Sequence, residues 1–500
     1  MPKLDDYRWE DLNRNSQSNR NNMTDLLNKT GPGFCLAKWT QVTMHLGNGL
    51  THSCHHPGAH KIPLEELATN PTALHNTNHK KQRRKEMLRG ERPSECDFCW
   101  RVEDNGEISD RTLKSVQPWS FSDHDIIAKS NGDENVDPRY VEVNFNRICN
   151  FACAYCSPNF SSKWDSDIRE NGAYDVGETK YNWIDPNIKY YNNNEHNPYI
   201  EAFWKWFPDM VGKLHTFRIT GGEPLLSKDT WKVMDYLIEN PQPNLEFSIN
   251  TNACPPGNQW KEFIDKVNIL TEKECVKRFE IYTSAEATGD RCDYIRDGMT
   301  WSLFRKNIED FLAGTKHTRV TVMAAFNILS LSSFTDLLVW VKTLKEQYSY
   351  NGLFDWFEAE GLHPPNIGIS HKQRKVNKIR GRMSIDIPYI RHPIFLDPGI
   401  ATMDLIDEWL IPSVNYMYEN TSSGDWFGNT RFEDYEALKL RRNIIDMILK
   451  AKQEPTPDIV RARKEFAKFI DIYDKRRNKN FLETFPEYKD FLEMCKKYDS

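Results

Sequence analysis

The 500-residue chain lacks any long apolar run, and no stretch approaches the roughly 20 apolar residues that a membrane-spanning helix needs. Its first residues, MPKLDDYRWEDLNRN, are charged and contain no apolar core of the kind found in a signal peptide. A strong excess of one charge is also missing, because 66 Lys and Arg face 72 Asp and Glu, a net charge of −6. We therefore expect a soluble, cytoplasmic protein with no membrane partner and no overall field that attracts nucleic acid.

Large aromatic side chains are plentiful, although the apolar fraction is only 39%. The chain has 15 Trp, 20 Tyr and 26 Phe, and its length is enough for two or three domains with a substantial core. Its eleven cysteines are an odd number in a chain without an export signal. Metal ligation is therefore a better expectation for them than a framework of disulfides.

Three of these cysteines, Cys149, Cys153 and Cys156, have the spacing C-x3-C-x2-C. The same spacing fits one face of a helix, but Asn150 interrupts the apolar pattern and Pro158 follows closely, so a loop is favoured. A [4Fe–4S] cluster has four irons, which thiolates normally hold. Three thiolates leave one iron open to a small molecule, which predicts a redox enzyme, an oxidoreductase.

Strands and helices are expected to alternate after residue 140. The predicted strands are Val141–Asn146, His215–Thr220, Leu245–Asn250, Phe279–Ser284 and Val320–Leu329, with a weak sixth at or near Ile367–Ser370. The predicted helices after the second to fifth strands are Lys228–Glu239, Gln259–Leu270, Trp301–Ala313 and Phe334–Gln347. Repeated βα units predict an α/β fold with a parallel sheet, here a partial (β/α)6 TIM-like barrel. The cysteine loop follows the first strand, at the end where barrel enzymes place their sites.

The cysteine spacing, with Tyr155 before the last cysteine, resembles that of the radical S-adenosylmethionine (radical SAM) superfamily. Gly221-Gly222-Glu223-Pro224, at the end of the second predicted strand, resembles the SAM-binding motif of that superfamily. Two glycines let the backbone approach a ligand closely. The resemblance, which covers roughly Tyr140 to Pro398, implies that this turn accepts hydrogen bonds from the methionine amino group of SAM.

Three further residues resemble SAM contacts of the superfamily. Asn252 lies just past the third strand, and Ser284, which ends the fourth, resembles the ribose contact. Arg296 resembles the basic residue that meets the SAM carboxylate. Each also fits an ordinary structural polar group. No catalytic residue is assigned beyond the cluster.

A second set of cysteines precedes the predicted barrel. Cys35, Gly49 and Cys54 match the pattern C-x(9–15)-G-x4-C, and Cys96 and Cys99 add a CxxC pair. This set resembles the twitch domain, a short relative of the SPASM domain that carries an auxiliary [4Fe–4S] cluster, here in an N-terminal arrangement. The alternative is a structural zinc site with four thiolates, or with some of the nearby histidines. Those histidines are His52, His55 and His56.

The expected organisation has four parts: a flexible arm over 1–30, a small Cys-rich twitch-like domain over 31–125, the radical SAM partial barrel over 135–400, and a helical C-terminal extension over 401–500. The polar segment Glu170–Pro198 is expected to be an insertion or lid. The basic run His79–Arg92 is expected to be the solvated face of a helix.

The resemblance implies an enzyme that reductively cleaves SAM with an electron from a flavodoxin- or ferredoxin-type reductant. The resulting 5′-deoxyadenosyl radical would abstract hydrogen from a substrate, by analogy a peptide, with sugar or nucleotide-linked molecules as the next option. The alternative class is a non-catalytic iron–sulfur or zinc-binding scaffold. Gly221–Pro224 argue against it, because a scaffold needs no SAM site.

Overall fold

The computed structural model describes residues 17–178, 180–192, 195–349, 381–421, 430–442 and 444–498. The chain divides into two compact units that alternate along the sequence. Unit 1 comprises Met1–Asn146, Ile188–Gly221 and Gln242–Phe247, and unit 2 comprises Arg147–Asn187, Gly222–Pro241 and Ser248–Ser500. This division differs from the expected boundaries at 31–125 and 135–400, and the domain assignment stays a prediction.

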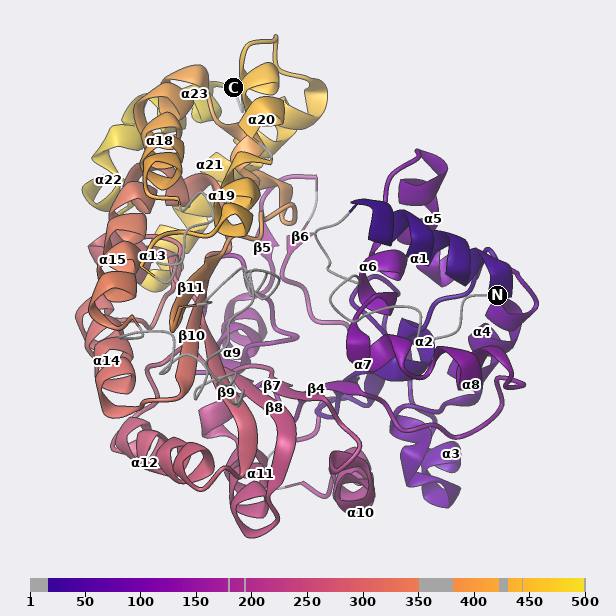
Figure 1. Ribbon diagram of the computed structural model, residues 1–500. Coiled ribbons are helices and arrows are strands. Elements are labelled where there is room, and N and C mark those ends of the chain that lie inside the picture. Colours follow the sequence, from indigo (N-terminus) through magenta and orange to yellow (C-terminus); the bar gives the residue numbers. More distant parts are fainter. Residues whose placement is uncertain are drawn as a thin grey trace, which may run out of the picture. The chain divides into compact units, whose positions relative to one another are not determined.

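Unit 1 contains strands in both parallel and antiparallel pairs, of which β4 and β7 are labelled in Figure 1. Its strands, in sheet order, are β7 (Thr216–Thr220), β4 (Tyr140–Asn144), β1 (Gln41–His45), β2 (Leu50–His52) and β3 (His60–Lys61). Strand β4 is parallel to both β7 and β1, whereas β2 is antiparallel to β1 and β3. His45 pairs with Leu50, so residues 46–49 connect the two strands of a hairpin, with φ of +69° at Gly49. The pairing of β1 with β4 was not predicted.

The helices of unit 1 surround an apolar core. They are α1 (Gln17–Thr30), α2 (Ala37–Thr40), α3 (Leu64–Thr69), η3 (Pro71–Leu74), α4 (Asn78–Leu88), η4 (Ser94–Cys96), α5 (Asp97–Asp104), α6 (Asp110–Ser115), α7 (Pro118–Phe121), α8 (His124–Ala128) and α10 (Pro198–Val211). Met23 and Leu27 of α1 are buried in this core with Trp39 and Trp100. The expected flexible arm is therefore wrong for residues 17–30, whose apolar side chains pack, while residues 1–16 lie outside the described residues.

The basic run also differs from the prediction. Within α4, Lys80 and Arg84 are fully buried, so the expected solvated face is wrong for both. Arg84 donates hydrogen bonds to the carbonyl of Lys38 and, at 2.8 Å, to Asn76 Oδ1. Lys80 Nζ lies 2.7 Å from His75 Nδ1. Burial lowers the pKa of Arg84 to about 9. Their polar partners come from outside the helix, which a pattern within the helix cannot reveal.

Unit 2 contains a parallel sheet covered by helices (Figure 1). Its strands, in order, are the end of β8 (Gln242–Asn250), then β9 (Val276–Thr283), β10 (Thr318–Met323) and β11 (Met383–Asp386), of which the last three run parallel. The flanking helices are α11 (Lys228–Glu239), α12 (Gln259–Glu272), α14 (Trp301–Gly314) and α15 (Phe334–Gln347). These helices confirm the predicted ranges to within two residues.

The fifth predicted strand, Val320–Leu329, is too long. Strand β10 ends at Met323, and Asn327 caps the short helix η6 (Ile328–Ser333). The predicted sixth strand, Ile367–Ser370, lies outside the described residues. The strand beside β10 is instead β11. The mixed α/β class is therefore confirmed, while closure into a partial barrel stays a prediction.

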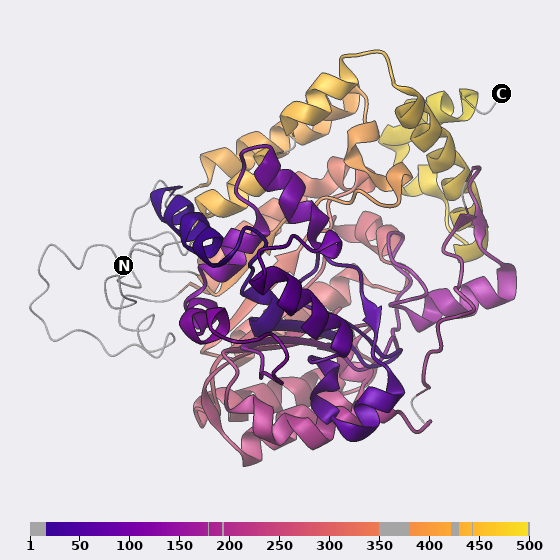
Figure 2. The ribbon, with the colours of Figure 1, turned by 90° about the vertical axis from the view of Figure 1, so that its right-hand side faces the viewer.

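The C-terminal part is mainly helical, as predicted, and its orange to yellow helices gather together in Figure 2. The elements are η8 (Ile394–Leu396), η9 (Pro398–Ile400), α17 (Met403–Leu405), η10 (Ile406–Leu410), α18 (Ile411–Glu419), α19 (Asp434–Arg441), α20 (Ile444–Ala451), α21 (Pro457–Arg477), α22 (Phe481–Thr484), η11 (Pro486–Tyr488) and α23 (Lys489–Lys497). Arg477 donates to Asp167 of α9 (Ser162–Asn171) at 3.0 Å, and Lys479 lies 3.1 Å from Asp297. Among the described residues, none of the helices has the length and apolar character needed to cross a bilayer.

Leu27→Ala tests whether α1 belongs to the core of unit 1. Leu27 is fully buried, so the truncation should lower the free energy of unfolding by about 2–5 kcal/mol, measured by urea denaturation of the full chain. Lys29→Ala, at an exposed position of the same helix, should change it by about 0.5 kcal/mol or less. Equal effects of the two substitutions would show that α1 does not pack.

Candidate functional site

The three-cysteine segment is a loop, as predicted, and backbone hydrogen bonds fix it in unit 2. The Ala152 N–H donates to the carbonyl of Asp297 at 2.8 Å, and the Ala154 N–H donates to the carbonyl of Ile295 at 2.7 Å. Ile295 is the last residue of α13 (Gly289–Ile295), and Asp297 follows that helix. The loop therefore has a defined shape without being helical or extended.

Side chains from the segment after the loop hold its carbonyl groups. The Trp164 Nε1–H of α9 donates to the Cys153 carbonyl at 2.9 Å. The Tyr181 hydroxyl and the Asn182 amide both donate to the Cys156 carbonyl, at 3.0 and 2.8 Å. Tyr181 ends the small hairpin of β5 (Tyr174–Asp175) and β6 (Lys180–Tyr181). The segment expected to be a lid thus contributes directly to the cysteine loop.

Of the three cysteines of the loop, Cys153 is buried, and Cys149 and Cys156 are half-buried. Burial, together with the neighbouring Cys153, raises the pKa of Cys156 to about 12 and also raises the pKa of Cys149. Thiols in such a setting become ligands when a metal replaces their protons. The arrangement therefore suits metal binding better than reactivity as free thiolates.

The ligand spacing that a single zinc ion requires can be compared with the groups of side chains in the structure. Tetrahedral zinc, with Zn–S of about 2.3 Å, needs sulfurs about 3.8 Å apart. In the described part of the chain, the one group of three ligating side chains with all ligand atoms within 4.8 Å of one another contains no cysteine. The iron–sulfur assignment of both cysteine sets stays a prediction.

The Gly-Gly-Glu-Pro turn lies against the first residues of the cysteine loop. A Cβ on Gly222 would come within 2.2 Å of the Ile148 carbonyl oxygen, so this position requires glycine. The Glu223 N–H donates to the same oxygen at 2.6 Å. Gly221 has φ of +132°, a conformation that also favours glycine. Within the protein, the double glycine thus allows backbone to approach backbone.

The side chain of Glu223 ties this turn to the end of β8. It is 1% exposed and accepts hydrogen bonds from the Asn252 N–H at 2.6 Å, the Thr251 hydroxyl at 2.8 Å and the Leu225 N–H at 3.0 Å. Burial raises the pKa of Glu223 to about 7, although these hydrogen bonds oppose the rise. Pro224 then begins the short helix η5 (Pro224–Leu226). Glu223 therefore positions the turn.

Two of the weaker predicted contacts differ in their surroundings. Asn252 is buried, with its amide donating to Asn150 Oδ1 at 2.7 Å and its Oδ1 accepting from the Cys254 N–H at 2.9 Å. Ser284 is half-buried, and its hydroxyl makes no hydrogen bond among the described residues. Asn252 therefore serves the local structure, whereas Ser284 keeps its hydroxyl for another partner.

The structure adds Glu286, which sequence reasoning missed. Its Oε1 accepts hydrogen bonds from the Tyr155 hydroxyl at 2.6 Å and from Arg296 Nη1 at 3.2 Å. Arg296 Nη1 also donates to the Tyr155 oxygen at 2.5 Å. Glu286 lies only two residues after Ser284, at the end of the same strand. A polar residue at this position was the feature of the sequence that could have identified it.

The pair of Glu286 and Arg296 retains unused polar atoms. Glu286 Oε2 and Arg296 Nε are buried without a hydrogen-bond partner. Burial raises the pKa of Glu286, although Arg296 opposes the rise. Burial lowers the pKa of Arg296, but Cys153, Tyr155 and Glu286 outweigh it and raise the pKa well above the ordinary value. One cationic donor and one acceptor beside the cysteine loop thus remain available to a small polar ligand.

The N-terminal cysteines meet in unit 1. Cys35, Cys54, Cys96 and Cys99 line one cavity, together with Arg111 and other residues. Burial, with the other three cysteines, raises the pKa of Cys35, and burial raises the pKa of Cys96 to about 11. The sulfurs of Cys54 and Cys99 accept backbone N–H groups. Residues that lie far apart in the sequence therefore form one four-thiol site.

The histidines of the zinc alternative behave differently from one another. His56 lines the cavity with the cysteines. The Nε2 of His52 lies 3.2 Å from His45, and its Nδ1 lies 2.5 Å from the Cys54 carbonyl oxygen, so both its nitrogens have partners. The nitrogens of His55 and His56 approach Asp110. His52 is therefore engaged elsewhere, whereas His56 shares the cavity with the four thiols.

No protein-family profile matches the chain. The chain is 24% identical over 229 residues to the GTP 3′,8-cyclase of Campylobacter lari, a match that covers 44% of the chain and 58% of the cyclase. It thus spans less than two thirds of that relative's length.

Two solved structures of SuiB from Streptococcus suis are also similar. The complex with precursor peptide SuiA has 11% sequence identity and a TM-score of 0.28, and the match covers 72% of this chain and 73% of SuiB. The complex with S-adenosylmethionine has 11% sequence identity and a TM-score of 0.29, and the match covers 71% of this chain and 72% of SuiB. TM-scores this low do not establish a shared fold. The chain is thus similar over part of its length to this cyclase, and its three-cysteine loop lies beside the Gly-Gly-Glu-Pro turn.

Proposed function

We propose that the chain is a radical SAM enzyme whose site is the loop of Cys149, Cys153 and Cys156. The observation that carries the proposal is the contact between the Gly222–Glu223 turn and Ile148, because it joins the two motifs in one place. The three thiols supply ligands for three irons of a [4Fe–4S] cluster. The chemistry that such a cluster would supply when bound is one electron for cleavage of the sulfur–C5′ bond of SAM to methionine and a 5′-deoxyadenosyl radical, which would take hydrogen from a substrate.

The residues around the loop supply the SAM contacts in this proposal. Arg296, through its unpartnered Nε, binds the SAM carboxylate, and the unpartnered Oε2 of Glu286 accepts from a donor group of SAM. The Ser284 hydroxyl is available to a ribose oxygen. The remaining predicted contacts, Gly221, Gly222, Glu223, Pro224, Asn252 and Tyr155, shape the site through the hydrogen bonds and close approaches described above.

The four N-terminal cysteines hold an auxiliary [4Fe–4S] cluster in this proposal. Four thiols in one cavity support full ligation, which suits electron transfer or a structural role better than substrate binding at an open iron. Backbone N–H groups that donate to Cys54 and Cys99 would stabilise the added negative charge of a reduced cluster and so raise its reduction potential. A single zinc held by the same four thiols is the alternative, and the metal content of the purified protein distinguishes the two.

The substrate proposed first is a peptide, which rests on the resemblance of the N-terminal cysteines to the twitch domain. A nucleotide is the second candidate, since the relative from Campylobacter lari is named for a reaction of GTP. The two are distinguished by adding GTP or candidate peptides to the reduced enzyme with SAM. Loss of GTP during turnover supports the nucleotide, and a mass change in a peptide supports the first proposal.

Substitution of a loop cysteine tests the central proposal. Cys149→Ala, Cys153→Ala or Cys156→Ala should abolish formation of 5′-deoxyadenosine from SAM and dithionite in anaerobically reconstituted protein, because each removes an iron ligand. Cys275→Ala, at a buried cysteine outside both motifs, should leave it unchanged. Wild-type protein that binds zinc and forms no 5′-deoxyadenosine would instead support the non-catalytic scaffold.

The unpartnered atoms of Glu286 and Arg296 predict an effect of these two residues on the affinity for SAM. Glu286→Gln and Arg296→Lys should each weaken SAM binding about ten-fold or more, since a hydrogen bond to a charged group contributes roughly 1.5–3 kcal/mol. The dissociation constant would be measured by isothermal titration calorimetry on iron-loaded protein. Arg291→Lys, whose guanidinium instead pairs with Glu487 at 3.0 Å, is the matched control. Equal affinity in all three variants would exclude the pair from the SAM site.

Cys96→Ala separates the two cysteine sets. It should lose about four irons per chain, one cluster, and stop product formation, yet keep some uncoupled cleavage of SAM. Iron is measured colorimetrically, with Cys495→Ala as the buried control. Full iron content and full product formation in Cys96→Ala would disprove the auxiliary cluster.

A further inference from the structure

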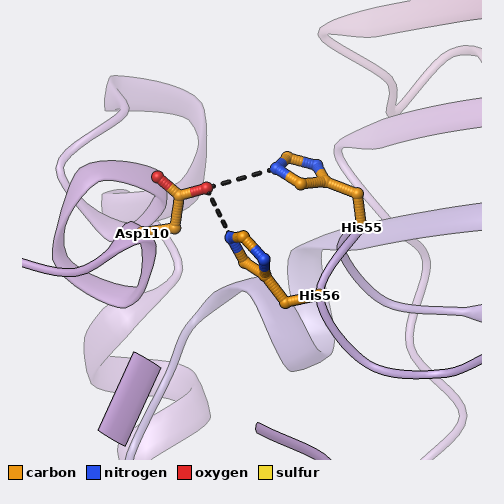
Figure 3. Close-up of side chains that lie close together, drawn as sticks. All are labelled: His55, His56 and Asp110. Carbon is orange, nitrogen blue, oxygen red and sulfur yellow. Dashed lines mark hydrogen bonds and ion pairs between the residues drawn. The ribbon is translucent and has the colours of Figure 1, made fainter. Parts of the chain in front are cut away.

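The loop between β2 and β3 brings two adjacent histidines to the first residue of α6 in unit 1 (Figure 3). The Nε2 of His55 lies 3.2 Å from Asp110 Oδ2, and the Nε2 of His56 lies 2.8 Å from the same oxygen. The three ligand atoms all lie within 4.8 Å of one another. Two imidazoles from one loop and a carboxylate from a helix thus converge on a single point.

The separations suit one small ion. Tetrahedral zinc, with Zn–N and Zn–O of about 2.0–2.2 Å, places neighbouring ligand atoms about 3.3–3.6 Å apart. The observed 3.2 and 2.8 Å are slightly shorter than that. The His55 side chain is 62% exposed, so it can turn to admit an ion without disturbing the core.

The surroundings hold His56 in place. Its imidazole stacks on the ring of Phe98, with centroids 3.9 Å apart and planes 11° from parallel. Its backbone N–H donates to the Cys54 sulfur. Asp110 is positioned by the start of α6, where the Ser109 side chain caps the helix. Two of the three ligands are therefore oriented before any ion arrives, which lowers the ordering cost of binding.

We propose that His55, His56 and Asp110 form a binding site for a divalent transition-metal ion, zinc in the first place. Two imidazoles and one carboxylate are ligands for zinc and other borderline ions, whereas Mg²⁺ and Ca²⁺ take oxygen ligands. Three protein ligands leave the fourth position of the ion to water or to an anionic group of a bound molecule.

This site is distinct from the four-cysteine centre. No cysteine sulfur belongs to the group of ligand atoms within 4.8 Å that His55, His56 and Asp110 form among the described residues. His56 and Asp110 nevertheless line the same cavity as the cysteines. The ion would therefore border the auxiliary centre, and its binding does not depend on whether the chain cleaves SAM.

The test measures zinc and iron in the same sample of full-length, iron-loaded protein, so that the cysteines are already occupied. After incubation with one equivalent of Zn²⁺ and gel filtration, wild-type protein should retain about one zinc per chain by mass spectrometry of the metals. Asp110→Asn, His56→Asn and the exposed His55→Asn should each bind Zn²⁺ at least about ten-fold more weakly, with iron unchanged. His196→Asn, at an exposed histidine 2.9 Å from Glu201 alone, should match wild type.

Three outcomes would overturn the proposal. One is zinc retained in full by Asp110→Asn and His55→Asn, which would place the ion elsewhere. Another is iron lost by His56→Asn with zinc unchanged, which would make His56 a ligand of the iron centre. The third is no zinc bound by wild-type protein that has its full iron content. Iron missing from wild-type protein would instead count against the auxiliary cluster, so the two failures are distinguishable.

Discussion

The close approach of Gly222 to the Ile148 carbonyl is the constraint on which the candidate site depends. A side chain at this position would overlap the backbone at the start of the cysteine loop, and the Glu223 N–H donates to the same carbonyl oxygen. The Glu223 carboxylate then extends the connection to Asn252 at the end of β8. The start of the cysteine loop, the Gly-Gly-Glu-Pro turn and the end of β8 are thereby connected through these contacts.

Much of this arrangement could be predicted because it depends on patterns of residues that lie close together in the sequence. The helices α11, α12, α14 and α15 follow from apolar periodicity, and the cysteine and glycine motifs follow from spacing. The roles of Asn252 and Ser284 were left open, since a polar residue at a strand end fits a ligand or a structural partner equally well. Glu286 was missed because its importance comes from its contact with Arg296, ten residues further along and across a turn.

The N-terminal half shows where sequence patterns stop being informative. The spacing of the cysteines identified the four thiols of the cavity, but nothing in the run His79–Arg92 shows that Lys80 and Arg84 are buried. Their partners, such as His75 and Asn76, are ordinary polar residues, and only tertiary structure brings them near. The parallel pairing of β1 with β4 is likewise a long-range contact that a local hairpin signal does not contain.

The bond between Arg477 and Asp167 spans 310 residues of chain. Ribosomes add about 5–20 residues per second, so roughly 15–60 s pass between the emergence of Asp167 and the synthesis of its partner. During that interval the nearby thiols Cys149, Cys153 and Cys156 are outside the ribosome without one of the contacts that braces their surroundings. The surroundings of this loop are therefore completed only after translation has passed Arg477.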